Sequence, residues 1–242
     1  MTCRLCKENR PLRKSHIFPE WLYTPLYNDN HQFFVFSTNE NKKRGTRPKG
    51  IYEKLLCPEC EQRFGEWEGY ARNVFYDLSL SGKDIGNRIV VSKIKYTPFK
   101  LFQMSLIWRA SISNRPELHK INLGPHGERI RKMLLEANPG EIHKYGSILM
   151  LPPASLKKIM REFIYPPEYL PKKIDGHAAC RAAFGGLFWL FIISNHSARI
   201  PYDLFLSKDG QLPVFKVGDQ AIKFMEQLAL DFSKAGMLNE QA

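Results

Sequence analysis

The amino-acid sequence predicts an α+β fold in which a small cysteine-stapled module is followed by helices and a small antiparallel sheet. Four of the five cysteines lie within the first 60 residues. Later in the chain, apolar residues recur first at helical and then at strand-like spacing. A chain of 242 residues with 43% hydrophobic and 25% charged residues is typical of a globular protein. We expect a first module over residues 1–80 and an α+β domain without an assigned role over 81–242.

The first module is predicted to contain short elements around its cysteines. Pro19 begins a short helix over 19–27, because proline is tolerated in the first turn of a helix. Aromatic and β-branched residues predict a strand over 31–38, and glycine and proline mark residues 39–50 as a polar loop. A long amphipathic helix is then expected from Cys57 to the segment at 81–86. Its apolar stripe consists of Phe64, Trp67, Tyr70, Ala71, Val74, Phe75 and Leu78.

The remaining chain is predicted to alternate between strands and helices before it ends in a sheet. The expected elements are a strand at 87–94 and helices at 98–113, 124–137 and 153–164. The proline-rich segment 165–173 is predicted to be an internal boundary. Strands are expected at 185–194, 203–210 and 212–217, with Asp209-Gly210 as the hairpin turn between the last two. A final helix is predicted over 219–235.

No stretch of the sequence is long and apolar enough to predict a membrane span. The longest apolar run, residues 182–193, suits a buried strand better than a membrane helix. The first residues carry charges and cysteines where a signal peptide needs an apolar stretch. We therefore expect a cytoplasmic protein with no membrane partner.

Two Cys-x-x-Cys pairs, Cys3/Cys6 and Cys57/Cys60, predict one structural zinc site. A two-residue spacer lets one tight turn offer two thiolates to a tetrahedral ion. Disulfides or a redox pair are the alternatives, and a reducing compartment disfavours them. Zinc would supply much of the folding free energy of a module with so thin a core. Cys180, in an apolar stretch, is expected to be a buried small side chain.

The net charge of +12 favours binding to a polyanion such as DNA. The loop at 42–49 concentrates this charge and is the predicted phosphate contact; its basic residues are Lys42, Lys43, Arg44, Arg47 and Lys49. The alternatives are that the charge serves solubility and that the loop is simply solvated.

The N-terminal 70 residues resemble the HNH nucleases that carry a four-cysteine zinc site. The resemblance rests on Ser15-His16-Ile17-Phe18-Pro19 after the first cysteine pair and on Leu55-Leu56-Cys57-Pro58-Glu59-Cys60-Glu61 at the second. A pair in a loop, a hairpin and a second pair opening a helix form the treble-clef arrangement of that family. The remaining chain resembles uncharacterised bacterial proteins that share this module, many of them in mobile-element or phage-defence contexts.

The resemblance implies that His16 is the general base that activates a water, and that Glu61 binds a catalytic Mg²⁺ or Mn²⁺ ion. Ser15 replaces the family's aspartate. The stretch 50–53 lacks its asparagine, so Glu53, Asn39 or Asn41 would have to serve. The alternatives are that His16 caps the cysteine loop or binds the zinc, and that Glu61 is a helix-start carboxylate.

The resulting prediction is a metal-dependent endonuclease, or a nuclease-derived effector of phage defence, that hydrolyses DNA phosphodiesters. The alternative is a non-catalytic zinc protein that binds nucleic acid or a protein partner. Because the sequence shows no ATP-binding loop, energy-dependent sensing would require a separate sensor or ATPase subunit.

Overall fold

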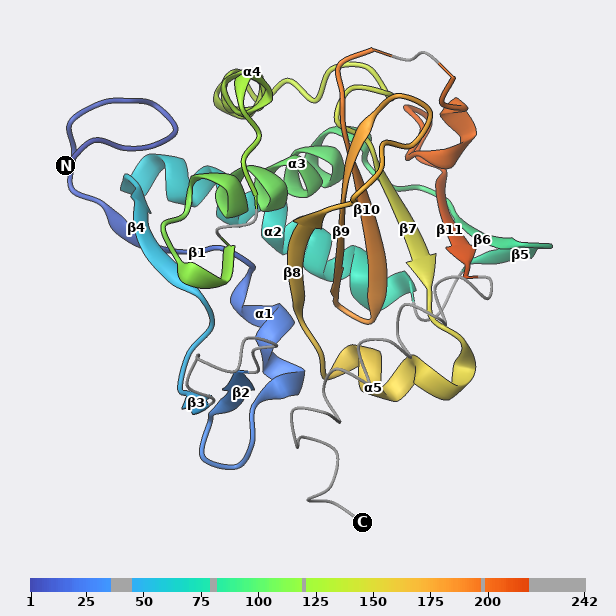
Figure 1. Ribbon diagram of the computed structural model, residues 1–242, viewed down its shortest axis with the longest axis horizontal. Helices are drawn as coiled ribbons and strands as arrows, with labels where there is room; N and C mark the ends of the chain where they lie inside the picture. Colours follow the sequence, from blue (N-terminus) through green and yellow to red (C-terminus); the bar gives the residue numbers. More distant parts are fainter. Residues whose placement is uncertain (36–44, 79–81, 119–120, 197–198, 218–242) are drawn as a thin grey trace.

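The computed structural model has a mixed helix-and-sheet architecture, and it describes residues 1–35, 45–78, 82–118, 121–196 and 199–217 (Figure 1). At the N-terminus, β1 (Arg13–His16) pairs antiparallel with β4 (Tyr52–Leu56). The segment between them contains α1 (Glu20–Tyr23), the 3-10 turn Thr24–Leu26, β2 (Phe33–Val35) and β3 (Gly45–Arg47). β2 and β3 form a second two-stranded sheet. The short helix and the strand expected near 31–38 are thus present.

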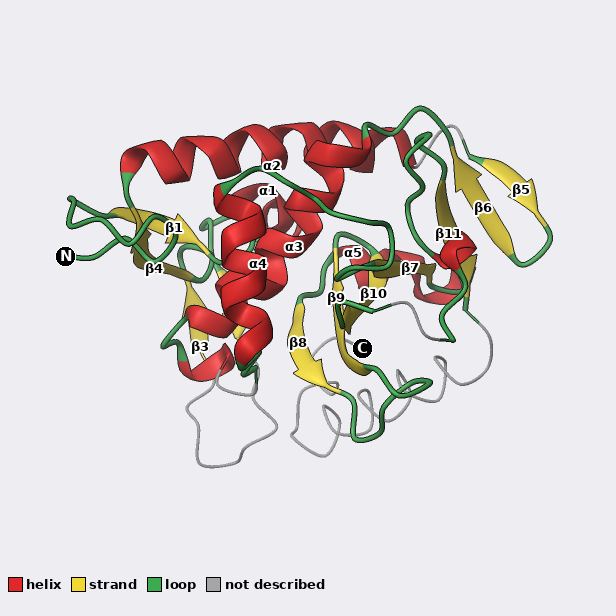
Figure 2. Cartoon of the chain, turned by 90° about the horizontal axis from the view of Figure 1, so that it is seen from above, coloured by secondary structure: helices red, strands yellow, loops and turns green. Residues whose placement is uncertain are grey.

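Two long helices form the layer that connects the N-terminal strands to the sheet. α2 (Pro58–Leu78) follows directly from the second cysteine pair, and α3 (Tyr96–Ile112) is buried along most of its length. α4 (Pro125–Leu135) packs on α3, and α5 (Lys157–Arg161) follows the 3-10 turn Ala154–Leu156. The four predicted helices in this part of the chain are confirmed, the last of them in a shorter form. Figure 2 shows α2 running across one side of the molecule above the sheet.

The sheet has seven strands in the order β5-β6-β11-β7-β10-β9-β8. Its strands are β5 (Lys83–Ile85), β6 (Arg88–Val91), β7 (Ser147–Leu151), β8 (Tyr165–Tyr169), β9 (Ala178–Phe184), β10 (Leu187–Ile193) and β11 (Leu212–Lys216). All pairings are antiparallel except the one between β11 and β7, which is parallel. The sheet is therefore larger than predicted, and mixed rather than antiparallel.

Strand β10 is buried on both faces, which explains its uninterrupted apolar sequence. On one face, the Trp189 ring stacks on Phe75 of α2 at 5.9 Å between centroids and lies 6.5 Å from Phe102 of α3. On the other face, Phe188 packs with Met160 of α5. The main core extends without a break from the cysteines to Val214 of β11.

Two predictions for the C-terminal part are wrong. Residues 203–210 form no strand: Tyr202–Leu204 is a 3-10 turn, and Asp209-Gly210 closes a loop that bonds back to Ile94. The boundary expected at 165–173 begins instead with β8, which pairs with β9 at the edge of the sheet. The strand tolerates Pro166 and Pro167 because they lie at the edge of the sheet, where the pairing with β9 is interrupted between Tyr165 and Glu168.

Two further observations bear on the remaining predictions. The predicted final helix over 219–235 lies outside the described residues. Within the described part of the chain, no helix is both long and apolar enough to cross a bilayer.

Candidate metal centre and the neighbouring histidine

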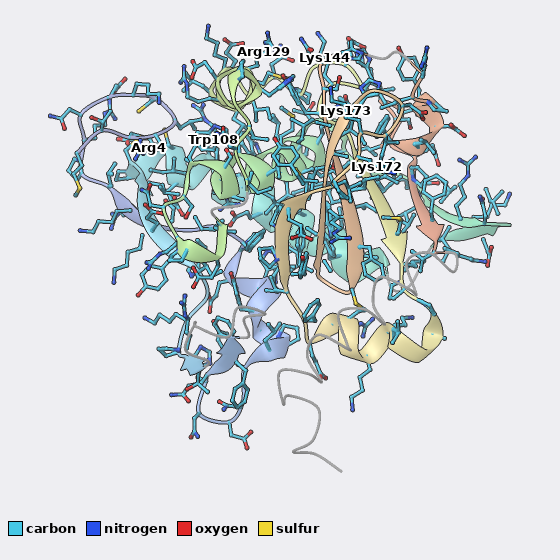
Figure 3. The ribbon with its side chains drawn as sticks, in the orientation of Figure 1. Arg4, Trp108, Arg129, Lys144, Lys172 and Lys173 are labelled. Carbon is cyan, nitrogen blue, oxygen red and sulfur yellow. The ribbon has the colours of Figure 1, made fainter. Side chains whose placement is uncertain are left out.

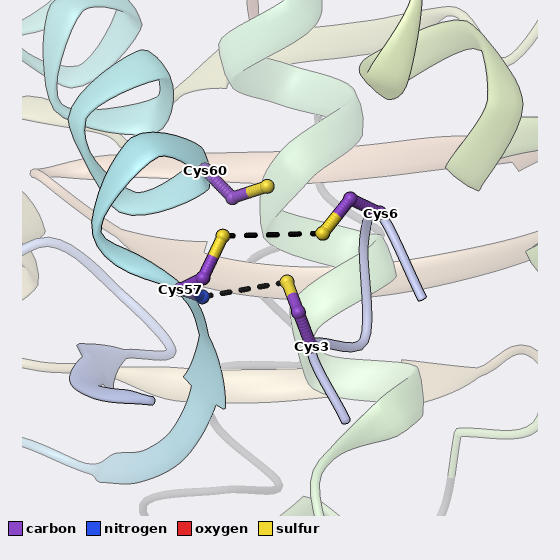
Figure 4. A group of neighbouring side chains, drawn as sticks. All are labelled: Cys3, Cys6, Cys57 and Cys60. Atoms are coloured by element: carbon purple, nitrogen blue, oxygen red, sulfur yellow. Dashed lines mark hydrogen bonds between the residues drawn. The ribbon is translucent and has the colours of Figure 1, made fainter. Parts of the chain in front are cut away.

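The two cysteine pairs come together in one cluster, as predicted (Figure 4). All four sulfur atoms lie within 4.8 Å of one another. The Sγ atoms of Cys6 and Cys57 are 3.9 Å apart, too far for a disulfide. Four sulfurs at about 2.3 Å from a tetrahedral zinc ion would be about 3.8 Å apart. The cluster therefore has the donor set and the spacing for a metal ion such as zinc.

Backbone hydrogen bonds help to position both cysteine pairs. The first pair lies in a tight loop closed by the bonds from Cys3 N to Glu8 O (2.9 Å) and from Lys7 N to Cys3 O (3.0 Å). The bond from Arg4 N to Leu55 O (2.9 Å) ties this loop to β4. The second pair sits at the start of α2, and the Cys57 N–H donates to the Cys3 sulfur at 3.3 Å.

The electrostatics of the cluster favour a bound cation. Burial, reinforced by the neighbouring sulfurs of Cys57 and Cys3, raises the pKa of the Cys60 thiol. Burial also raises the pKa of Cys57. Four clustered thiols, three of them buried, cannot all ionise against one another, whereas a divalent cation among them deprotonates coordinating thiols. The four cysteines thus fit a structural zinc ion chemically as well as geometrically.

A second polar group joins β1 to the first turn of α2. Successive side chains of a strand point to opposite faces, and β1 directs Ser15 inward and His16 towards the surface. The buried Ser15 hydroxyl donates to Glu61 Oε2 at 2.5 Å. Positions 15 and 61, which the family resemblance links to one ion, are therefore in direct contact.

His16 has a carboxylate partner of its own. Its Nε2 atom lies 2.8 Å from Oε2 of Glu20, the first residue of α1, and the imidazole is 31% exposed. The other oxygen of Glu20 accepts a hydrogen bond from the Tyr27 hydroxyl. The His16 ring also meets the edge of Tyr52 at 6.1 Å, opposite on β4. The imidazole of His16 thus faces a carboxylate that the Tyr27 hydroxyl holds in place, and it remains partly exposed to water.

A buried arginine from α3 lies beneath both groups. Arg109 is 1% exposed, and its Nη1 atom donates to the His16 carbonyl at 2.5 Å and pairs with Glu68 of α2 at 2.6 Å. Its guanidinium stacks over the Phe64 ring at 5.4 Å. Burial raises the pKa of Glu61, while the Ser15 hydrogen bond and the charge of Arg109 oppose that rise. Positive charge beside Glu61 therefore comes from a fixed side chain.

The residues around Glu61 give no support for a catalytic divalent ion. Mg²⁺ and Mn²⁺ need several oxygen ligands, but Glu61 meets a hydroxyl and the field of an arginine. Within the described residues, the cysteines are the one group of three or more metal-ligating side chains that converges. Glu53, a possible substitute ligand, instead accepts hydrogen bonds from Ser113 Oγ (2.8 Å) and from the backbone and side chain of Asn114 (2.9 Å each).

The predicted phosphate-contacting loop is described only in part. Lys42, Lys43 and Arg44 lie outside the described residues, as do the alternatives Asn39 and Asn41. Arg47 pairs with Glu117, and Lys49 is exposed.

Two other basic residues contact the same tyrosine ring as His16. Lys14 and Arg115 lie over the Tyr52 ring, at 5.3 and 5.7 Å from its centroid. The sequence reasoning did not name Glu20, Arg109 or Arg115 as part of this site. The i,i+4 spacing of His16 and Glu20 and the single arginine inside an apolar helix were the available signals.

Comparison with known proteins adds no relative. No family model, no curated protein and no solved structure matches the chain.

Proposed function

We propose that the protein is an HNH-type endonuclease, or an effector derived from one, that hydrolyses DNA phosphodiesters with His16 as general base. The single observation that carries the proposal is the pair of His16 and Glu20, whose side chains are 2.8 Å apart. His16 ends β1, which pairs with β4 next to the second cysteine pair. The loop-borne pair, the β1–β4 hairpin and the helix-borne pair support a treble-clef arrangement with zinc as its structural ion.

The chemistry assigned to this chain is confined to its own residues. We assign the Nδ1 lone pair of the imidazole to a water molecule, since its Nε2 atom faces the Glu20 carboxylate at 2.8 Å. Removal of a proton from that water generates the nucleophile that attacks phosphorus. Lys14 and Arg115, both beside Tyr52, supply positive charge for the phosphate oxygens. No step is assigned to a divalent ion, because the residues around Glu61 give no support for one.

A plasmid-nicking assay with Mg²⁺, Mn²⁺ or chelator tests the proposal. We expect His16→Ala to lower the nicking rate by about 10²- to 10⁴-fold, since that is the usual contribution of a general base. Glu20→Gln should cause a smaller loss, because it removes the charge beside the imidazole and keeps the shape of the side chain. Lys83→Ala, on an exposed position of β5, is the control. If the pure protein does not cleave and His16→Ala leaves any cellular phenotype intact, the nuclease assignment is wrong.

The buried Arg109 supports a second candidate, a non-catalytic zinc protein that binds nucleic acid or a protein partner. A guanidinium paired with Glu68 beside Glu61 supplies without metal the positive charge that a divalent ion would bring. In that case DNA binding should persist without cleavage under every metal condition. Affinity that stays constant between low and physiological ionic strength would exclude the phosphate contact in both candidates. A separate sensor or ATPase subunit remains a proposed partner for either activity.

A further inference from the structure

A cavity of about 360 Å³ lies between α4 and the ends of β9 and β10, away from the cysteines. Helix α4 contributes one wall, the turn before β9 a second, and the segment after β10 a third. Three histidines and two cations from these three segments line it, together with a serine hydroxyl: His126, Arg129, Lys173, His177, Ser194 and His196.

The lining of the cavity is cationic. The described residues that line it include no aspartate or glutamate. Arg129 and Lys173 are both exposed at its rim. Figure 3 labels Arg129 and Lys173, together with Lys144 and Lys172, in the same half of the molecule in this view. Such an arrangement attracts an anion and presents several N–H donors to it.

The α4 wall is held in place by a buried tyrosine. His126 Nδ1 and the Tyr145 hydroxyl are 3.1 Å apart, and Tyr145 is almost fully buried. The Tyr145 N–H donates to the carbonyl of Ser194 at 2.9 Å, which ties the helix side of the cavity to the end of β10. Burial raises the pKa of Tyr145, and the nearby Arg129 opposes that rise. The donors on α4 are thus fixed relative to the sheet.

The opposite wall is a tight hairpin. Ile174 and His177 exchange both backbone hydrogen bonds (2.9 and 2.8 Å) around Asp175 and Gly176, which have positive φ angles of 47° and 89°. Asp and Gly are the residues that tolerate such angles in a two-residue turn. The turn sets Lys173 beside the buried His177, whose ring lies 4.4 Å from that of His196. Imidazole and ammonium donors therefore converge from one rigid turn.

We infer that this cavity binds a phosphate group. The three histidines do not form a metal site, since the cysteines are the one converging ligand group within the described residues. A phosphate carries up to two charges and three terminal oxygens, and such an anion matches an arginine, a lysine and several imidazole N–H groups better than a carboxylate does. The volume is in the range of small-molecule sites, so the phosphate belongs to a nucleotide-sized ligand or to a nucleic-acid strand.

Titration of the purified full chain with inorganic phosphate and with AMP, followed by calorimetry, tests the inference. We expect Arg129→Ala/Lys173→Ala to weaken both ligands by about tenfold or more, since each charge-assisted hydrogen bond contributes strongly. Lys54→Ala/Lys83→Ala removes the same charge at exposed sites outside the cavity and should bind as wild type. Zinc content and thermal midpoint without ligand show whether each variant is folded.

A short single-stranded oligonucleotide separates the two sources of phosphate. Competition by AMP, together with weaker oligonucleotide binding in the Arg129/Lys173 variant, would assign the cavity to nucleic acid. AMP binding with unchanged oligonucleotide affinity would assign it to a free nucleotide. Either result supports the inference. It is overturned if the wild type gives no saturable response to phosphate or AMP, or if the double variant binds them equally well.

The inference does not rest on the proposed nuclease activity. The cavity includes neither His16 nor Glu20. His16→Ala should therefore leave phosphate binding unchanged while it abolishes nicking. Failure of one proposal leaves the other standing.

Discussion

The two ends of helix α2 lie in regions that are held together by different forces. At its N-terminal end, Cys57 and Cys60 face the first cysteine loop, where the packing is sulfur against sulfur. At its C-terminal end, Phe75 packs between Trp21 at 5.1 Å and Trp189 at 5.9 Å. One helix thus joins a region fitted for a metal to a region built on aromatic burial.

The comparison teaches where each region can be weakened. Loss of one ligand removes the whole stabilisation that a metal cluster provides, because the ion and its binding free energy are lost together. An aromatic core loses stability in increments, because each ring contributes its own buried area to the free energy of unfolding. The polar contacts of Arg109 and Glu53 link the two regions, and each can be changed singly.

The largest effect is expected at the cysteine cluster. Cys57→Ser should reduce bound zinc from about one ion per chain to a small fraction and unfold the N-terminal module, because structural zinc contributes about 10–16 kcal/mol in small zinc domains. Zinc content by elemental analysis and limited proteolysis measure the two effects. Cys180→Ala, in the buried centre of β9, is the matched control and should keep its zinc. Full zinc content in Cys57→Ser would contradict the four-cysteine assignment.

The aromatic region gives the next prediction. Trp189→Ala should lower the free energy of unfolding by about 3–5 kcal/mol, as large-to-small changes in a packed core do. Trp189 is fully buried and stacks on Phe184 at 4.6 Å and on Phe191 at 5.6 Å. Denaturant unfolding measures the loss, and Ile85→Ala at an exposed position of β5 should change it little. Loss of zinc at 25 °C in the still-folded Trp189→Ala protein would mean that the two regions are not separable.

The cysteine site was predictable from sequence because the spacing of the cysteines is itself typical of zinc ligands. Two Cys-x-x-Cys pairs specify four donors whatever lies between them. The long helices were predictable for a similar reason, since their apolar periodicity is local. The helices depend on residues near one another in the chain, and the cysteine site depends on the number and type of its ligands.

The sheet and the polar contacts depended on partners that are distant in sequence. β9 consists largely of alanine, and it becomes a strand because it pairs with β10 and β8. The hairpin turn at Asp175-Gly176 has the expected dipeptide, but the proline-rich segment before it suggested a boundary. Residues 203–210 have a strand-like composition, but they pair with no strand, and Tyr202–Leu204 forms a 3-10 turn. The Arg109 pairing with α2 and β1 spans too great a separation for any local pattern.

Arg109 tests the link between the two regions. Arg109→Met should cost about 3 kcal/mol, because it leaves Glu68 without its cation and the His16 carbonyl without its donor. Glu68 is 20% exposed, so water can partly replace the lost partner. The double variant Arg109→Met/Glu68→Met should recover part of the loss, since replacing both members of a buried pair is tolerated better than removing one. With Glu68→Met as the other single variant, a double-variant loss equal to the sum of the two single losses would show that the pair contributes no coupling.

The smallest effect is expected at Glu53, where β4 meets the end of α3. Burial alone would raise the pKa of this carboxyl, but hydrogen bonds from Ser113 and Asn114 outweigh it and hold the pKa below its ordinary value. Because the folded pKa is the lower one, the stabilisation is present above the ordinary carboxyl range and is lost as pH falls through the folded pKa. Glu53→Gln should therefore cost about 1–2 kcal/mol at pH 7 and almost nothing in acid.

Comparing Glu53→Gln with wild type at each pH removes the acid-induced loss of zinc, which is common to both proteins. Glu162→Gln, the same substitution at an exposed position, serves as the control and should show no difference at any pH. A Glu53→Gln difference that stays constant from pH 7 into acid would mean that the side chain acts through shape and not through its charge. The stabilising link between the cysteine module and α3 would then depend on packing alone, as the aromatic end of α2 does.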